Sequence, residues 1–203
     1  IASHEGFIAL DARIVLHGKE VSDSQLPKPV IRPYPIEYVE LCTLKDGSKT
    51  LLRPICPEDE KKIKVFHKHL SENTIRNRYF EFMSLDDRIA HERLIRICFN
   101  DYDRQIALVA CKGDEIIGIC RISKIPGTNF CDLKLIIDDK HHNLGLGTLF
   151  IEKMIAIAKE EKIERILATI LHENTGMIHI VKKHGFQCTE DQTKTYITAS
   201  LSV

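Results

Sequence analysis

Short apolar runs separated by turn residues predict most of the strands in this chain. Asp46-Gly47 separates apolar runs at 38–44 and 49–53, and Gly113-Asp114 separates runs at 105–112 and 115–124. Such pairs between two apolar runs predict β-hairpins, because glycine and aspartate tolerate the backbone angles of a tight turn. Further strands are predicted at 6–16, 129–138, 164–170 and 193–201.

Apolar residues at helical spacing predict the helices. Pro57-Glu58-Asp59-Glu60 places a proline and three acids where a helix start favours them, and the pattern continues to about Leu70. Another helix follows Gly145-Leu146-Gly147, and segments 74–98 and 173–184 are expected to be mostly helical. Most strands come early and helices cross over later, which predicts a mixed α/β sheet.

Composition narrows the function classes. The 203 residues suffice for one well-buried domain with a short appendage. With 29 Lys and Arg against 29 Asp and Glu, the chain has no bulk positive field for a nucleic acid. No apolar run approaches the roughly 20 residues of a membrane helix. Seven scattered cysteines without a Cys-x-x-Cys pair fit small buried side chains in a reducing cytoplasm.

The first residues are expected to form an extension. Residues 26–35 contain four prolines, which remove backbone donors and favour extended structure, so this stretch is predicted to be a linker. We therefore expect a boundary near residue 36, with an extension at 1–36 and the main domain at 37–203. Because Ile1 is not a normal translation start, the chain is expected to be part of a longer protein.

The glycine loop at 142–147 is the clearest candidate for ligand chemistry. His142-Asn143-Leu144-Gly145-Leu146-Gly147 follows a predicted strand and opens a helix, where converging backbone N–H groups favour a phosphate. A dinucleotide fold would need a third glycine at Phe150, and a Walker loop would need a lysine after Gly147. Both nucleotide motifs fail, which leaves another phosphate ligand or a simple tight turn.

Other segments of the chain decide between a phosphate-binding loop and a simple tight turn. The chain resembles the GNAT acyltransferase superfamily and, within it, the Pat-type protein lysine acetyltransferases of bacteria, whose acyl-CoA loop reads Gln/Arg-x-x-Gly-x-Gly/Ala. Segments 52–60, 101–110 and 174–186 also resemble family segments, in the same order. The resemblance covers 37–203 and implies a mostly antiparallel mixed sheet with a splayed parallel strand pair and flanking helices.

The extension carries a second resemblance. Residues 9–14 and 31–35 are similar to the end of an ATP-grasp domain and to the junction that follows it in Pat-type enzymes. Such enzymes carry an acyl-CoA-synthetase-like region ahead of the acyltransferase. The resemblance therefore implies upstream domains of the same polypeptide as partners.

The resemblance also implies a co-substrate and its binding residues. Acetyl-CoA would lie between the splayed strands, with pantetheine bonded to the backbone of Ile136 and Ile137 and the pyrophosphate among the amides of 143–148. The residues implied to bind it are Ile136, Ile137, His142, Asn143, Leu144, Gly145, Leu146, Gly147, Thr148 and Asn174. An amine would attack the thioester directly in a ternary complex, so Cys131 is interpreted as a core residue rather than a nucleophile.

Asp132 is the candidate general base. A lysine amine is almost wholly protonated at neutral pH, so a base must remove its proton. Pat-type enzymes carry a glutamate thirteen residues before the first glycine of the loop, and that position here is Asp132. Strand alternation places it on one face with Lys134 and Ile136. The alternative interpretation is a surface ion pair with Lys134, which would weaken Asp132 as a base.

Departures from the family pattern keep a second hypothesis open. Leu144 stands where a basic residue is common, and His142 stands where Gln or Arg is common. Val181 stands where many members have a tyrosine that acts as general acid to the leaving thiolate. The first hypothesis is an N-acetyltransferase acting on a protein lysine, with an acyl-CoA synthetase as the candidate protein and a small-molecule amine as a variant. The second is a catalytically weak acyl-CoA-binding regulatory module.

No metal site is predicted. His91-Glu92 and His172-Glu173 each lack the second histidine of a zinc-protease helix, with Ile95 and Gly176 in its place.

Overall fold

The computed structural model describes the chain except for residues 1, 4–5, 9–13 and 22–31. Contacts divide it into two units, 1–30 and 31–203, so the division falls ahead of the boundary expected near residue 36. In the first unit, β1 (Ala2–Ser3) pairs with β2 (Gly6–Phe7). The strand predicted at 6–16 is wrong at 14–16, where exposed apolar residues have no strand partner, and 9–13 lie outside the described residues.

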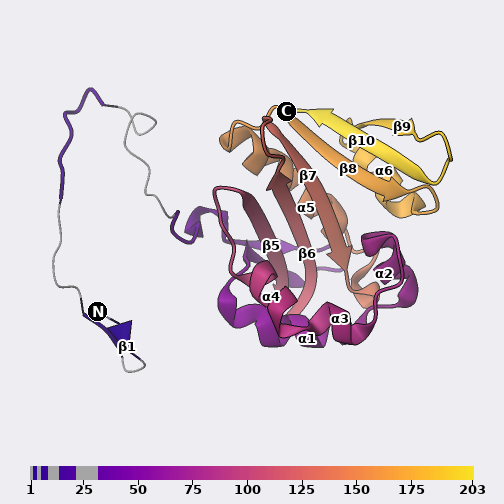
Figure 1. Cartoon of the computed structure of the whole chain (residues 1–203), viewed down its shortest axis with the longest axis horizontal. Coiled ribbons are helices and arrows are strands. Elements are labelled where there is room, and N and C mark those ends of the chain that lie inside the picture. The colour runs from indigo at the N-terminus through magenta and orange to yellow at the C-terminus, as the bar shows by residue number, and fades with distance from the viewer. Residues whose placement is uncertain (1, 4–5, 9–13, 22–31) are drawn as a thin grey trace. The chain divides into compact units, whose positions relative to one another are not determined.

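The second unit contains an eight-stranded sheet in the order β3-β4-β5-β6-β7-β8-β10-β9 (Figure 1). Its strands are β3 (Glu40–Thr43), β4 (Lys49–Pro54), β5 (Gln105–Lys112), β6 (Glu115–Lys124), β7 (Phe130–Ile137), β8 (Arg165–Leu171), β9 (Gln187–Glu190) and β10 (Tyr196–Ser202). All neighbours are antiparallel except β7 and β8. The predicted mixed, mostly antiparallel sheet and both predicted hairpins are therefore confirmed.

The parallel pair β7–β8 separates part-way along its length. Pairing runs only from Phe130↔Arg165 to Asp132↔Leu167, although β7 continues to Ile137 and β8 to Leu171. On its other edge, β7 stays paired with β6 as far as Ile137. The splayed strand pair implied by the family resemblance is thus present, and it opens toward the carboxyl ends of both strands.

Helices cover the two faces of the sheet. They are α1 (Glu60–His69), α2 (Glu72–Tyr79), α3 (Leu85–Ile89), α4 (His91–Cys98), α5 (Leu146–Glu160) and α6 (Thr175–Lys183). In Figure 1, α1, α3 and α4 lie in front of the sheet and α5 lies behind it. Alternation along β5 explains this arrangement: Leu108 and Ala110 join the cluster that packs with α5, whereas Ala107 and Val109 join the cluster that packs with α1 and α4.

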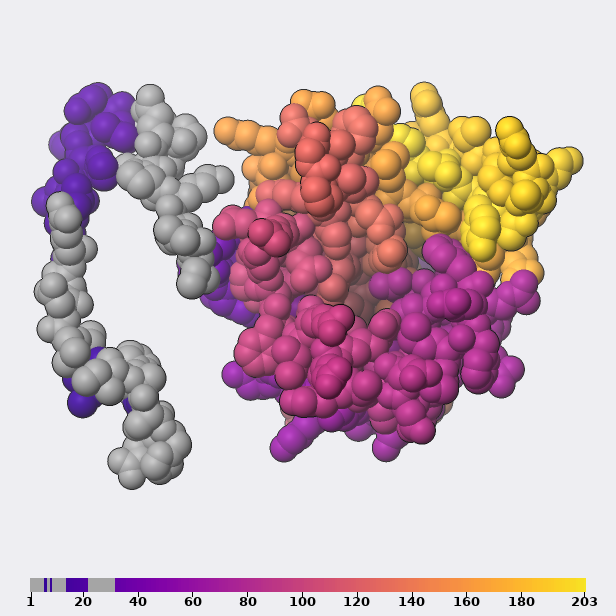
Figure 2. All heavy atoms as spheres, in the orientation of Figure 1, coloured from indigo at the N-terminus to yellow at the C-terminus, as the bar shows by residue number. Residues whose placement is uncertain are grey.

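The predicted helical segment 74–98 is divided into separate short helices. Phe80 adopts a left-handed conformation (φ 68°) that ends α2, and Ser84 caps α3 by accepting a hydrogen bond from the backbone N–H of Asp87. The ring of Phe80 meets that of Tyr196 on β10, with centroids 5.5 Å apart. Arg76 of α2 pairs with Glu173 at 3.0 Å. Figure 2 shows the surface of α2 adjoining the yellow C-terminal strands.

Within the part of the chain that the structure describes, no helix is long and apolar enough to cross a membrane.

Candidate active site

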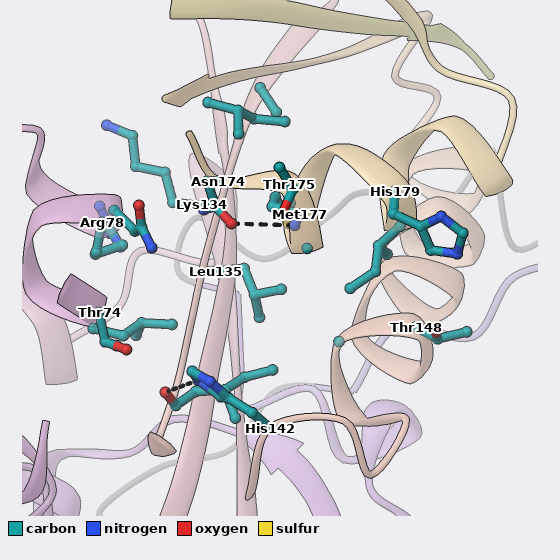
Figure 3. A pocket seen from close by; sticks show the side chains of 18 of the residues that line it. Thr74, Arg78, Lys134, Leu135, His142, Thr148, Asn174, Thr175, Met177 and His179 are labelled. Atoms are coloured by element: carbon teal, nitrogen blue, oxygen red, sulfur yellow. Dashed lines mark hydrogen bonds between the residues drawn. The ribbon is translucent and has the colours of Figure 1, made fainter. Parts of the chain in front are cut away.

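A cavity of about 850 Å³ lies where β7 and β8 separate (Figure 3). Its wall is built by the second half of β7, the facing part of β8, the loop before α5, the first turns of α5 and α6, and one side of α2. The β7 residues Leu133–Ile137 do not pair with β8. That edge of β7 can therefore pair with an extended ligand in the way that an added strand would.

The first turn of α5 forms one end of this cavity. Gly145 is the N-cap residue in a left-handed conformation (φ 87°), and no side chain caps the helix there. Asn143 is also left-handed (φ 63°), which turns the chain sharply between η4 (Asp139–His141) and α5. The first-turn amides of a helix have no partner within it, so this end of the cavity favours an anion.

Gly147 lets α5 and α6 approach closely. A Cβ atom at this position would lie 2.8 Å from Ile180 Cδ1 and 3.6 Å from Ile137 Cδ1. Gly147 also lines the cavity, so a side chain here would narrow it. A side chain at Gly147 would therefore have to displace the ends of Ile180 and Ile137, whereas the left-handed turn itself is made at Gly145.

Eight of the ten residues expected to bind the co-substrate line the cavity: Ile136, Ile137, His142, Asn143, Gly145, Gly147, Thr148 and Asn174. The side chain of Leu146 is buried in the core, and the Leu144 carbonyl accepts a hydrogen bond from Lys45 N at 3.0 Å. Neither of these two residues lines the cavity. The binding role of all ten stays a prediction.

His142 is held against the end of β7. Its Nε2 lies 3.0 Å from the carbonyl oxygen of Ile137 and donates to it, because a carbonyl can only accept (Figure 3). One of the two expected backbone partners of pantetheine is thus already engaged. Asn174 caps α6, and its Oδ1 accepts a hydrogen bond from the Met177 N–H at 3.2 Å.

Among the described residues, the cavity is lined by cations and by no carboxylate. The cations in its wall are Lys45, Arg78, Lys134 and Lys183. Such a lining attracts a ligand with several negative charges. Lys45 and Arg78 were not predicted from the sequence, because they come from the β3–β4 turn and from α2, far from the loop in sequence. The local sequence carries no signal for either position.

A family model described as Acetyltransferase (GNAT) domain matches residues 49–187. The chain belongs to the GNAT acetyltransferase family.

Individual GNAT proteins show the same similarity at low sequence identity. Acetyltransferase PA5475 of Pseudomonas aeruginosa is 24% identical over 148 residues, which cover 71% of this chain and 78% of that protein. The GNAT domain of S. lividans PAT superposes with a TM-score of 0.77 at 22% identity, covering 84% of this chain and 100% of that one. PaiA N-acetyltransferase from Thermoplasma acidophilum, solved in complex with coenzyme A, gives a TM-score of 0.62 at 15% identity, with 76% and 99% covered.

In this GNAT domain, Asp132 lies on the face of β7 opposite α5. Its neighbours Cys131 and Leu133 pack in the cluster that contains α5, whereas Ile136 packs with α1, as strand alternation predicts. Asp132 Oδ2 lies 3.2 Å from Lys134 Nζ, and about a third of the Asp132 side chain is exposed. Asp132 is not among the residues that line the cavity. The ion pair weighed as the alternative is therefore present, and the general-base role stays a prediction.

Two other positions fit their expected roles. Burial raises the pKa of the Cys131 thiol to about 12, and its side chain is fully buried, so it is a core residue rather than an available nucleophile. Val181 is fully buried in α6, so no acidic group stands at this position. Among the described residues, no group of three His, Cys, Asp or Glu side chains is arranged to hold a metal ion.

Proposed function

We propose that this GNAT domain transfers the acetyl group of acetyl-CoA to an amine, and that the amine is a lysine side chain of a protein. The observation that carries the proposal is the single cavity that joins the splayed edge of β7 to the uncapped N-terminus of α5. An acyl-CoA has a strand-like pantetheine arm joined to a charged pyrophosphate, and this cavity offers each part its own partner.

The residues of the cavity divide the work of binding. The amides at the start of α5, together with Lys45, would hold the pyrophosphate through hydrogen bonds and charge. The open edge of β7 would hold the pantetheine arm and so place the thioester where the strands begin to separate. A backbone N–H of β7 at that point would stabilise the negative charge that develops on the thioester oxygen.

Acyl transfer then needs one proton removed from the acceptor. The acceptor nitrogen forms a bond to the thioester carbon, the carbon–sulfur bond breaks, and the thiolate of coenzyme A leaves. In our proposal Asp132 takes the proton from the amine, since it is the one carboxylate of β7 and lies at the last residue of β7 that pairs with β8. Positioning of the two substrates supplies the rest of the rate increase.

The choice of a protein lysine rests on the Pat-type features. The segments that resemble this class lie in order along the chain, and the GNAT domain of S. lividans PAT shares the fold over its full length. The 3.2 Å contact between Asp132 and Lys134 favours the second hypothesis, a weakly catalytic module that binds acyl-CoA.

Transfer of radiolabelled acetyl-CoA separates these hypotheses. The protein is incubated with an acyl-CoA synthetase, a lysine-containing peptide and small amines in parallel, and both label and free thiol are measured. We expect label on protein lysine with an equal amount of thiol released. Label on small amines alone would refute the lysine assignment, and tight binding without any transfer would identify a binding module.

A further inference from the structure

A second cavity, of about 420 Å³, lies on the helix-covered face of β6 and β7. Its wall includes residues of α1, α2, α4, β6 and β7. Arg78, Lys134 and Ile136 line both this cavity and the larger one. The two spaces therefore meet at the part of β7 where the thioester is proposed to lie, next to the face that carries Asp132.

This second cavity is strongly cationic. Of the described residues, five permanent cations and one carboxylate, Glu92, line it; the cations are Arg78, Arg93, Arg96, Arg121 and Lys134. His67 also lines it but stays neutral at physiological pH, because burial and the nearby Arg88, Arg93 and Arg78 lower its pKa to about 3. Among the described residues, Lys134 is paired with Asp132 at 3.2 Å and the four arginines form no ion pair, so the wall keeps a net positive charge.

Among the described residues, three of these arginines form no ion pair, although the Asp132 carboxylate acts on Arg78 over a longer distance. Within the described part of the chain, the guanidinium groups of Arg78, Arg93 and Arg96 make no hydrogen bond or ion pair, and Arg93 Nε is buried without a partner. Arg78 and Arg93 both lie against the ring of Tyr79, at 5.1 and 5.2 Å from its centroid. Tyr79 thus contacts two guanidinium groups that line the cavity.

The strands add a like-charge pair. Arg121 on β6 stands directly opposite Lys134 on β7, and the anion beside this like-charge pair is Asp132, whose Oδ2 lies 3.2 Å from Lys134 Nζ. Arg121 is positioned by hydrogen bonds to Gln105 Oε1 at 2.9 Å and to the Ile97 carbonyl at 3.1 Å. Burial lowers the pKa of Arg121 to about 10 and also lowers that of Arg78, because a buried guanidinium loses its hydration. Hydrogen bonds position Arg121, whereas the described residues leave the hydrogen-bond donors of the Arg78, Arg93 and Arg96 guanidinium groups available to a ligand.

Building on the proposed acetyl transfer, we infer that this second cavity binds carboxylate groups of the acceptor that lie beside the acceptor amine. Guanidinium groups match carboxylates in shape and charge, and bidentate pairs of this kind are strong and directional. The acceptor amine would enter from this cavity and reach the thioester past Lys134 and Ile136. The selected substrate is therefore an amine in an acidic context, either a lysine flanked by Asp or Glu or a small amine that carries carboxylates.

Matched acceptors test the inference. Two lysine peptides of equal length carry Glu or Gln on both sides of the lysine, and a small amine with a carboxylate is compared with its amide. We expect kcat/KM to be about 10- to 100-fold higher for the carboxylate member of a pair at low salt, and the ratio to shrink as salt rises. The pair with the larger ratio identifies the source of the carboxylate. Equal kcat/KM within both pairs would overturn the inference.

Variants locate the effect in the cavity. In the double variant Arg93→Gln, Arg96→Gln, the ratio between the Glu and Gln peptides is expected to fall toward one. Arg104→Gln is the matched control, since Arg104 is an exposed arginine paired with Asp101 and lines neither cavity. A ratio that falls equally in both variants, or in neither, would contradict the assignment.

A binding measurement separates this inference from the proposed function. The same peptides with acetyl-lysine in place of lysine cannot react, and their affinity is followed by fluorescence anisotropy in the presence of coenzyme A. Tighter binding of the Glu peptide that is lost in the double variant would support a carboxylate site in the second cavity. If no acetyl transfer were seen in the same protein, the proposed function would fail and this inference would stand. No preference in binding would overturn the inference even if transfer were observed.

Discussion

Replacing Gly147 by aspartate is expected to weaken coenzyme A binding by at least about 100-fold. The new carboxylate would lie in the first turn of α5, among the amides proposed to hold the pyrophosphate. Two unit charges about 5 Å apart repel by roughly 3 kcal/mol at an effective dielectric constant of about 20. Each 1.4 kcal/mol changes affinity about tenfold, so one such contact accounts for about two orders of magnitude.

The steric part of this change is smaller and can be measured separately. The added Cβ would meet the ends of two flexible side chains, Ile180 Cδ1 at 2.8 Å and Ile137 Cδ1 at 3.6 Å, rather than backbone. Overpacking of this kind costs about 1 to 3 kcal/mol of stability. A carboxylate at a helix N-terminus is itself favourable for folding, so Gly147→Asp should fold at least as well as Gly147→Asn.

Calorimetric titration of coenzyme A into the two variants and Gly147→Ala tests the placement. Asparagine has the size of aspartate without its charge, so the Asp-to-Asn difference isolates the electrostatic part. We expect Gly147→Ala and Gly147→Asn to bind within about tenfold of one another and Gly147→Asp to bind far more weakly. Equal affinity of Gly147→Asp and Gly147→Asn would refute a phosphate at this helix end.

The remaining predictions concern the base, a buried ion pair and the extension. Asp132→Asn should lower turnover about 10²- to 10⁴-fold at neutral pH, and the loss should shrink at high pH. Asp132→Glu should retain or increase turnover. Full activity of Asp132→Asn at every pH would leave Asp132 only its ion-pair role. Burial alone would raise the pKa of Asp59, but the hydrogen bonds and charge of Arg53 together with the hydrogen bonds from Cys56 lower it. These contacts therefore stabilise the fold above about pH 4, and their contribution is lost as pH falls further. Asp59→Asn should cost about 3 kcal/mol in denaturant unfolding at neutral pH and less in acid, and a pH-independent difference would contradict this. Chains of residues 31–203 and 37–203 should both keep turnover. The shorter chain should have a lower Tm, because it loses contacts such as the hydrogen bond from Tyr34 Oη to the Pro54 carbonyl (2.8 Å). Lost turnover in a folded 37–203 chain would show that the extension takes part in catalysis.

Local signals in the sequence were sufficient for most of the fold. The turn pairs Asp46-Gly47 and Gly113-Asp114 lie in the predicted hairpins, because the conformation of a tight turn is decided by its own residues. The helix after Gly147 and the splayed strand pair were also predicted, the second through the family resemblance. The strand at 187–190 was missed because its residues, Gln-Cys-Thr-Glu, are polar at an exposed sheet edge.

The candidate site was less accessible to sequence reasoning. Loop residues such as His142 and Gly145 lie where their motif predicts, since the motif is continuous in sequence. The cations that surround the two cavities come from separate elements: Lys45 from a hairpin turn, Arg78 from α2 and Arg121 from β6. Their convergence depends on tertiary packing. The equal numbers of positive and negative residues in the sequence therefore gave no indication of two cationic cavities.

A crystal structure of this domain with coenzyme A bound tests the central claim most directly. The account predicts pantetheine hydrogen-bonded to the open edge of β7 between Leu133 and Ile137, and the pyrophosphate on the backbone amides of 143–148 at the start of α5. It also predicts that the thiol ends beside Lys134 and Ile136, where the two cavities meet. Coenzyme A bound with its pyrophosphate away from α5, or lying in the second cavity, would contradict the account.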